Sequence, residues 1–128
     1  MIENLEFLDI NWASELRRRH DGAPMLPPLF VIEHGPTIRL VDLGSTYDGA
    51  GPAGTIPGSA FVPPEALESV LAPVPDTTRV VLVSGQGQIA ADWALRLERS
   101  GRTRVAALEG GLAAWRRLGL RTERASRD

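Results

Sequence analysis

The sequence predicts an α/β fold with a central, mainly parallel five-stranded sheet and helices on both of its faces. Two observations carry this prediction. Apolar runs of strand length alternate with helical patterns, and the run from Val80 to Val83 is apolar at every position. Strands buried on both faces are typical of parallel sheets that are covered by helices on each side. The 128 residues, 43% of them apolar, suffice for one domain with a core.

The first half of the chain is expected to contain one helix and three strands. The helix covers residues 11–19 with Asn11 as its N-cap, and the Asp21-Gly22 pair and prolines between 24 and 28 end it. Strands are expected at 29–33 and 37–43, where apolar and β-branched residues gather. A loop rich in glycine and proline then fills 44–58, and a short strand follows at 60–62.

The second half alternates regularly between helix and strand. Helices are expected at 63–71, from 89 to about 99, and at 112–118, and strands at 79–83 and 105–108. The prolines at 63 and 64 open the first of these helices, and Gly119 ends the last one. The chain therefore divides into an N-terminal helix and loop (1–30) that is expected to belong to the domain, the domain proper (31–120), and a frayed polar tail (121–128).

Composition excludes several classes of function. Without cysteine there is no disulfide, thiolate metal site, Fe–S cluster or cysteine nucleophile, and two histidines cannot make a three-histidine metal site. We therefore expect no metal and no cofactor. Aromatic residues make up only 5% of the chain, which disfavours a stacking platform for nucleic acid. No apolar run approaches the roughly 18 residues that cross a bilayer, and the acidic start lacks a signal pattern, so a cytoplasmic location is expected.

One loop stands out as a candidate site because it links the most buried strand to a helix. In open α/β sheets, ligands bind beyond the carboxyl ends of the strands, and a helix N-terminus favours anions. Glycines in such a loop allow backbone N–H groups to converge on a ligand. The candidate anion-binding residues are Ser84, Gly85, Gln86, Gly87, Gln88 and Ile89.

Two enzymatic or nucleotide-binding interpretations of this loop remain open. The run from Gly85 to Ala90 fits G-x-G-x-x-[GA], and Glu109 lies where a ribose-binding acid would be expected, but about 80 residues precede the motif and only one strand follows it. Alternatively, Ser84 is a nucleophile. The flanking residues Leu82 and Gln86 do not fit G-x-S-x-G, and the available bases, His20 and His34, lie far upstream.

Two further segments flank the loop in the sequence. The first is Gly54-Thr55-Ile56-Pro57-Gly58-Ser59-Ala60, and the second is Leu108-Glu109-Gly110-Gly111 followed by Trp115. Together with the strand, loop and helix between them, they resemble the rhodanese-like (sulfurtransferase) domain family over about residues 37–120. The resemblance implies a parallel sheet of about five strands with helices on both faces. It also implies a cysteine after the central strand that carries sulfur as a persulfide.

The chain departs from the family pattern at the positions that carry chemistry. The resemblance places Ser84 at the position of the cysteine, Gly85 and Ile89 at positions where arginines are common, and Thr55 at that of a frequent histidine. Asp42 and Glu109 fit the pattern as supporting residues. We therefore assign no catalytic residue, and expect a pseudoenzyme that acts as a binding or regulatory module.

The expected partner of such a module is a small anion or another protein, and neither nucleic acid nor a membrane. Two alternatives from other functional classes stay open at this point. One is an enzyme or nucleotide binder that uses residues 84–90, and the other is a structural domain that works within a larger assembly.

Overall fold

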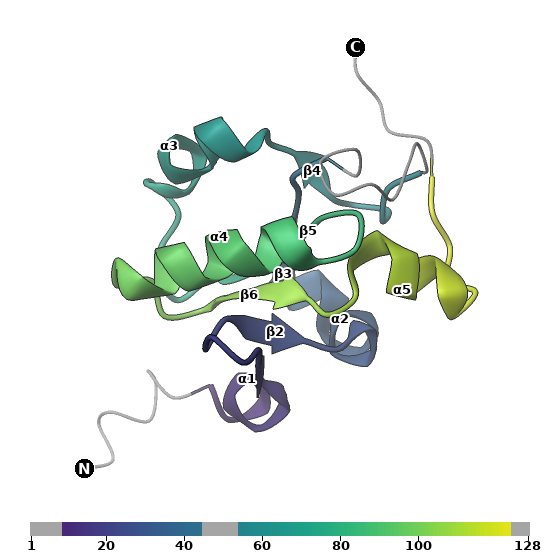
Figure 1. Cartoon of the computed structure of the whole chain (residues 1–128), viewed down its shortest axis with the longest axis horizontal. Helices are drawn as coiled ribbons and strands as arrows, with labels where there is room; N and C mark the ends of the chain where they lie inside the picture. The colour runs from purple at the N-terminus through teal and green to yellow at the C-terminus, as the bar shows by residue number, and fades with distance from the viewer. Residues whose placement is uncertain (1–8, 45–53, 124–128) are drawn as a thin grey trace.

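The computed structural model describes residues 9–44 and 54–123. These residues form a single mixed sheet with helices packed against it (Figure 1). The strand order is β1-β2-β6-β5-β3-β4, and every neighbouring pair is parallel except β1 and β2. The predicted mainly parallel α/β sheet is thus confirmed, with six described strands in place of five. Their bounds are β1 (Arg17–Arg18), β2 (Pro24–Leu26), β3 (Ile38–Asp42), β4 (Ala60–Phe61), β5 (Arg79–Val83) and β6 (Val105–Leu108).

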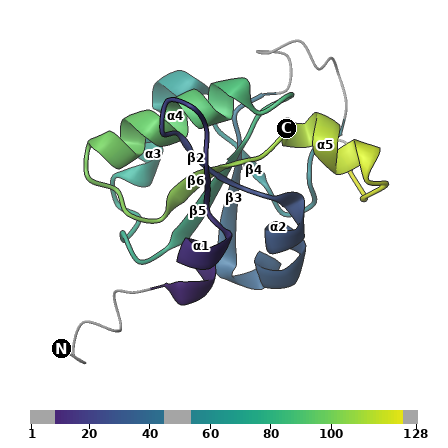
Figure 2. The same ribbon diagram turned by 60° about the horizontal axis from the view of Figure 1, so that its bottom comes forward.

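Helices cover both faces of this sheet (Figure 2). The α-helices are α1 (Ile10–Glu15), α2 (Pro28–His34), α3 (Leu67–Leu71), α4 (Gln88–Arg99) and α5 (Gly111–Arg117), and two 3₁₀ turns are η2 (Gly35–Thr37) and η4 (Pro64–Ala66). Strand β5 separates two cores because its side chains alternate in direction. Val80 and Leu82 pack with α3 and α4, whereas Val81 and Val83 pack with α1, α2 and α5.

The strongest sequence patterns give the most accurate element bounds. Strands β5 and β6 begin and end at the predicted residues. Helix α4 begins one residue earlier than predicted, and α5 starts and ends one residue earlier than predicted. The expected helix at 63–71 is a 3₁₀ turn followed by the short helix α3. The strand at 37–43 is confirmed as β3.

The predicted strand at 29–33 is wrong, because these residues lie in helix α2. Pro28 occupies the first turn, where its fixed φ angle suits a helix and its missing N–H costs no hydrogen bond. Phe30 and Val31 are buried whereas Leu29 and Ile32 are exposed, which is the pattern of a helix with one face on a core. Tertiary packing therefore overrides the β propensity of this run.

The sequence patterns missed two strands, β1 and β2, and the second of them begins at Pro24. A proline is tolerated there because it occupies the first residue of the strand. Strand β2 pairs with β6 and brings Leu26 into the core, while β1 adds two residues at the edge. The preceding helix is also shorter than expected, since α1 ends at Glu15 and is capped by Asp9 instead of Asn11.

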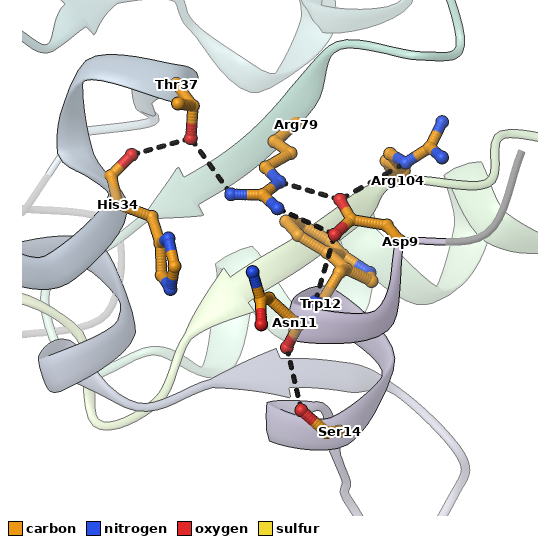
Figure 3. A network of polar contacts seen from close by, with 8 residues as sticks. All are labelled: Asp9, Asn11, Trp12, Ser14, His34, Thr37, Arg79 and Arg104. Atoms are coloured by element: carbon orange, nitrogen blue, oxygen red, sulfur yellow. Dashed lines mark hydrogen bonds and ion pairs between the residues drawn. The ribbon is translucent and has the colours of Figure 1, made fainter. Parts of the chain in front are cut away.

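Asp9 fixes the N-terminal segment to the start of β5 (Figure 3). Its two carboxylate oxygens accept hydrogen bonds from Arg79 at 2.7 and 2.6 Å, and Arg104 forms a further ion pair at 3.3 Å. Asp9 also accepts the N–H of Trp12 at 3.2 Å, which caps α1. Hydrogen bonding from Arg79 lowers the pKa of the Asp9 carboxyl below its ordinary value. The buried ring of Trp12 then packs edge-on against Phe30.

The beginning of the predicted tail is attached to the domain. The backbone groups of Glu123 and Thr55 exchange hydrogen bonds of 2.7 and 2.8 Å, and the carbonyl of Arg121 accepts the indole N–H of Trp115 at 2.8 Å. The expectation of a frayed tail is therefore wrong for residues 121–123. Residues 124–128 lie outside the described part of the chain, as do 45–53, which form most of the loop predicted at 44–58.

Candidate functional site

Ser84 follows the carboxyl end of β5, the strand that the sequence identifies as the most buried. Its side chain is 1% exposed, and its hydroxyl oxygen accepts the backbone N–H of Ala90 at 3.1 Å. This hydrogen bond spans the turn from strand to helix and satisfies one of the N–H groups that a helix leaves free at its start. Within the described residues the hydroxyl donates no hydrogen bond.

The turn between β6 and α5 packs directly against this loop. The N–H groups of Leu112 and Ala113 donate to the carbonyls of Ser84 and Gly85 at 2.9 and 2.8 Å. A Cβ atom on Gly111 would lie 2.3 Å from the Ser84 carbonyl oxygen and 2.5 Å from the Gly87 nitrogen. Only glycine allows such an approach, which explains why the Gly110-Gly111 pair accompanies the Ser84 loop.

Helix α4 begins at this loop, and two backbone donors in its first turn have no partner among the described residues. Gly87, at φ +93°, is the N-cap, and its carbonyl accepts the N–H of Ala91 at 3.0 Å. The N–H groups of Gln88 and Ile89 donate to no group in the described residues. Such donors, together with the helix dipole, favour an anion, although no side chain from 84 to 90 carries a charge.

Asp42 and Thr55 form a second polar group, at the end of the neighbouring strand β3. The sheet register pairs Asp42 with Val83, the residue before Ser84. The buried Asp42 carboxylate accepts the N–H of Gly44 at 2.8 Å and the hydroxyl of Thr55 at 2.5 Å. Asp42 therefore stabilises the loop that leaves β3, and its oxygens are occupied by protein donors.

The structure does not bring Glu109 or either histidine to Ser84. Glu109 forms a surface ion pair with Arg17 at 3.0 Å, a contact that no local sequence pattern indicated. His34 packs on the ring of Phe30, close to Thr37 and Arg79 (Figure 3). Arg79 begins β5 and Ser84 follows its end, so the length of this strand, about 17 Å, separates His34 from Ser84. His20 is exposed in the turn between β1 and β2. Neither histidine is positioned as a base for the Ser84 hydroxyl.

The part of the chain that the structure describes contains neither a group of metal ligands nor a membrane-spanning helix. No three histidine, aspartate or glutamate side chains within residues 9–44 and 54–123 are grouped so that they could hold a metal ion. None of the helices in these same ranges combines the length and apolar character required to cross a bilayer.

Comparisons with known proteins point to one family. The family model described as "Rhodanese-like domain" matches residues 32–118. A solution structure of a rhodanese-like domain from Anabaena sp. is 26% identical over 77% of this chain and 80% of that chain, with a TM-score of 0.59. A thiosulfate sulfurtransferase from Pseudomonas aeruginosa is 25% identical, covering 79% of this chain and 19% of that chain, with a TM-score of 0.64.

A third structure supports the same fold. A rhodanese-like domain protein from Staphylococcus aureus is 21% identical over 80% of this chain and 98% of that chain, with a TM-score of 0.61. No curated protein matches the chain significantly.

Proposed function

The chain belongs to the rhodanese-like domain family, and from this premise we propose that it is a member without sulfur-transfer activity whose Ser84 loop binds an anionic group. The observation that carries the proposal is Ser84 itself. A buried hydroxyl, hydrogen-bonded to Ala90, follows the central strand where the family resemblance implies a nucleophilic cysteine. The chain contains no cysteine at any other position that could take over this role.

The chemistry of the hydroxyl group supports the absence of sulfur transfer. A thiol becomes a thiolate near neutral pH, especially at a helix N-terminus, whereas a serine hydroxyl needs an adjacent base. The described residues place no histidine at Ser84, and an oxygen atom cannot carry sulfur as a persulfide. The loop also lacks an arginine that could stabilise an anionic intermediate.

Anion binding is the property of the loop that does not depend on a thiol. The N–H groups of Gln88 and Ile89, which have no acceptor among the described residues, lie at the start of a 12-residue helix. The Ser84 hydroxyl donates no hydrogen bond within the same part of the chain. Each is a donor for an oxyanion. Because residues 84–90 carry no charge, binding is expected to be weak, in the millimolar range. The ligand class is a small oxyanion or the phosphorylated or acidic side chain of a partner protein.

The geometry favours this proposal over dinucleotide binding. A pyrophosphate group needs open space between the glycine-rich loop and the end of the next strand. Here a Cβ atom on Gly87 would lie only 3.0 to 3.2 Å from backbone atoms of Gly111, Gly110 and Leu108. Glu109 is paired with Arg17 on the surface. The close backbone packing at Gly87 and the surface ion pair of Glu109 therefore disfavour a dinucleotide at this loop.

A titration with thiosulfate, monitored by amide NMR, tests the proposal. The amide signals of Gln88 and Ile89 are expected to shift saturably, and chloride at equal ionic strength is expected to have little effect. Ile89→Arg should tighten binding by about tenfold, because it adds a charge-assisted hydrogen bond, whereas Ile89→Leu should leave the affinity unchanged. Shifts spread evenly over the surface, or equal affinity in both variants, would refute anion binding at this loop.

A further inference from the structure

A cleft lies on the face of the sheet that α2 and α5 cover. Ile38 and Leu40 of β3 line it, and Ile56, from the segment between β3 and β4, lines it as well. Its volume is about 400 Å³, which is within the range of small-molecule binding sites. None of the residues from 84 to 90 lines it, so this cleft is separate from the Ser84 loop.

The lining of this cleft is apolar apart from one residue. Trp115 contributes an aromatic wall, and its indole N–H is already satisfied by the carbonyl of Arg121. Arg121 is the single charged residue among those that line the cleft. It is exposed, and its guanidinium forms no hydrogen bond or ion pair within residues 9–44 and 54–123. An open apolar cleft thus occurs together with one cation that has no partner among the described residues.

We propose that this cleft binds a small carboxylic acid with an apolar body, whose carboxylate pairs with Arg121. An alkyl chain or ring would gain from leaving water against Ile38, Leu40 and Trp115. A guanidinium presents a planar fork that matches a carboxylate with two parallel hydrogen bonds. An uncharged apolar ligand would leave Arg121 unpaired, and a cationic ligand would be repelled.

The size of the cleft and its single charge favour a small molecule over a protein chain. Stable protein interfaces bury about 800 Å² on each partner and carry several polar contacts around an apolar centre. The cleft is open to solvent and offers one apolar space of about 400 Å³ with one cation among its lining residues. The inference does not rest on the proposed function, because it uses no residue of the Ser84 loop.

Two ligands with the same chain length, one with an anionic and one with a neutral head group, provide the test. Octanoate and octan-1-ol are titrated into the full chain, with intrinsic tryptophan fluorescence and the unfolding midpoint as readouts. Octanoate is expected to quench fluorescence saturably and raise the midpoint, with an affinity about tenfold higher than that of octan-1-ol. The quenching should be absent in Trp115→Phe, which identifies the tryptophan that reports binding.

Three variants locate the ligand. Arg121→Gln should remove the preference for octanoate, whereas Arg117→Gln, an exposed arginine on α5 outside the cleft, should keep it. Gly35→Phe should weaken both ligands, because Gly35 lines the cleft, has an ordinary helical φ of −44°, and has open space around its missing Cβ.

The proposal is overturned by any of three results. The first is equal affinity for the acid and the alcohol in the unmodified chain. The second is a preference for octanoate that survives Arg121→Gln, and the third is unchanged binding of both ligands in a folded Gly35→Phe variant. Light scattering is recorded in parallel, and a dimer that Gly35→Phe dissociates would show that a second copy of the chain occupies the cleft, which also overturns the proposal.

Discussion

Replacing Gly111 with alanine tests directly whether close backbone packing holds the Ser84 loop in place. The added Cβ would meet three backbone atoms, the Ser84 oxygen at 2.3 Å, the Gly87 nitrogen at 2.5 Å and the Gln86 carbonyl carbon at 2.8 Å. None of these is the end of a flexible side chain, so the loop itself must move. Gly119→Ala is the matched control, because Gly119 also has a positive φ but has no atom within 4 Å of its missing Cβ.

The two substitutions share one cost and differ in another. A left-handed backbone conformation costs a non-glycine residue about 1–2 kcal/mol, and both variants should lose this amount. Forcing an extra methyl group into packed structure adds about 1–3 kcal/mol at Gly111 alone. Gly111→Ala should therefore be destabilised by about 2–5 kcal/mol, against about 1–2 kcal/mol for the control.

Urea unfolding of the unmodified chain and both variants measures this difference. In thermal unfolding, the extra loss of free energy of unfolding at Gly111 corresponds to a further fall in the midpoint temperature of about 4 °C per kcal/mol for a domain of this size. The amide signals of residues 84–90 should also shift in Gly111→Ala and stay in place in Gly119→Ala. Equal free energies of unfolding in the two variants, with an unmoved loop, would refute the packing argument.

Other variants probe the polar anchors of the fold. Asp9→Asn keeps a capping group but removes the partner of Arg79, and should reduce the free energy of unfolding by about 2–3 kcal/mol at pH 7. Because Arg79 holds the pKa of Asp9 below its ordinary 3.8, the difference from the unmodified chain should persist above that pH and shrink as the pH falls through the lowered native pKa. Thr55→Val leaves the buried Asp42 carboxylate without its hydroxyl donor and should cost about 1.5–3 kcal/mol in urea unfolding. Ser84→Cys should give little thiocyanate from thiosulfate and cyanide, since Ile89 and Gly85 leave the loop uncharged, and substantial turnover would show that backbone donors suffice.

The parts of the fold that could be predicted are those whose apolar residues follow a long, regular pattern. Strand β5 is apolar at four successive positions, and α4 repeats apolar residues every four positions, so each has one consistent structural interpretation. The run at 29–33 has no such distinction, because a short apolar segment fits a strand or a buried helix face equally well. Pro27 and Pro28 open the helix, although prolines are equally typical of a loop that ends the preceding helix.

The place of the Ser84 loop in the fold could be predicted, but its interactions could not. The sequence placed Ser84 and its glycines at the carboxyl end of the central strand, where the structure has them. It could not show that Glu109 pairs with Arg17, 92 residues away in the chain, because long surface side chains find partners that no local pattern encodes. The cleft at Trp115 and Arg121 was missed for a related reason, since its walls come from four separate segments.

The most direct test of the central claim is the rate of thiocyanate formation from thiosulfate and cyanide by the purified chain. Because a serine hydroxyl stands at the end of β5 and the chain has no thiol, we predict a rate equal to that of buffer at every protein concentration. A rate that rises in proportion to the protein concentration and disappears in Ser84→Ala would contradict the claim, because it would assign sulfur-transfer activity to this site.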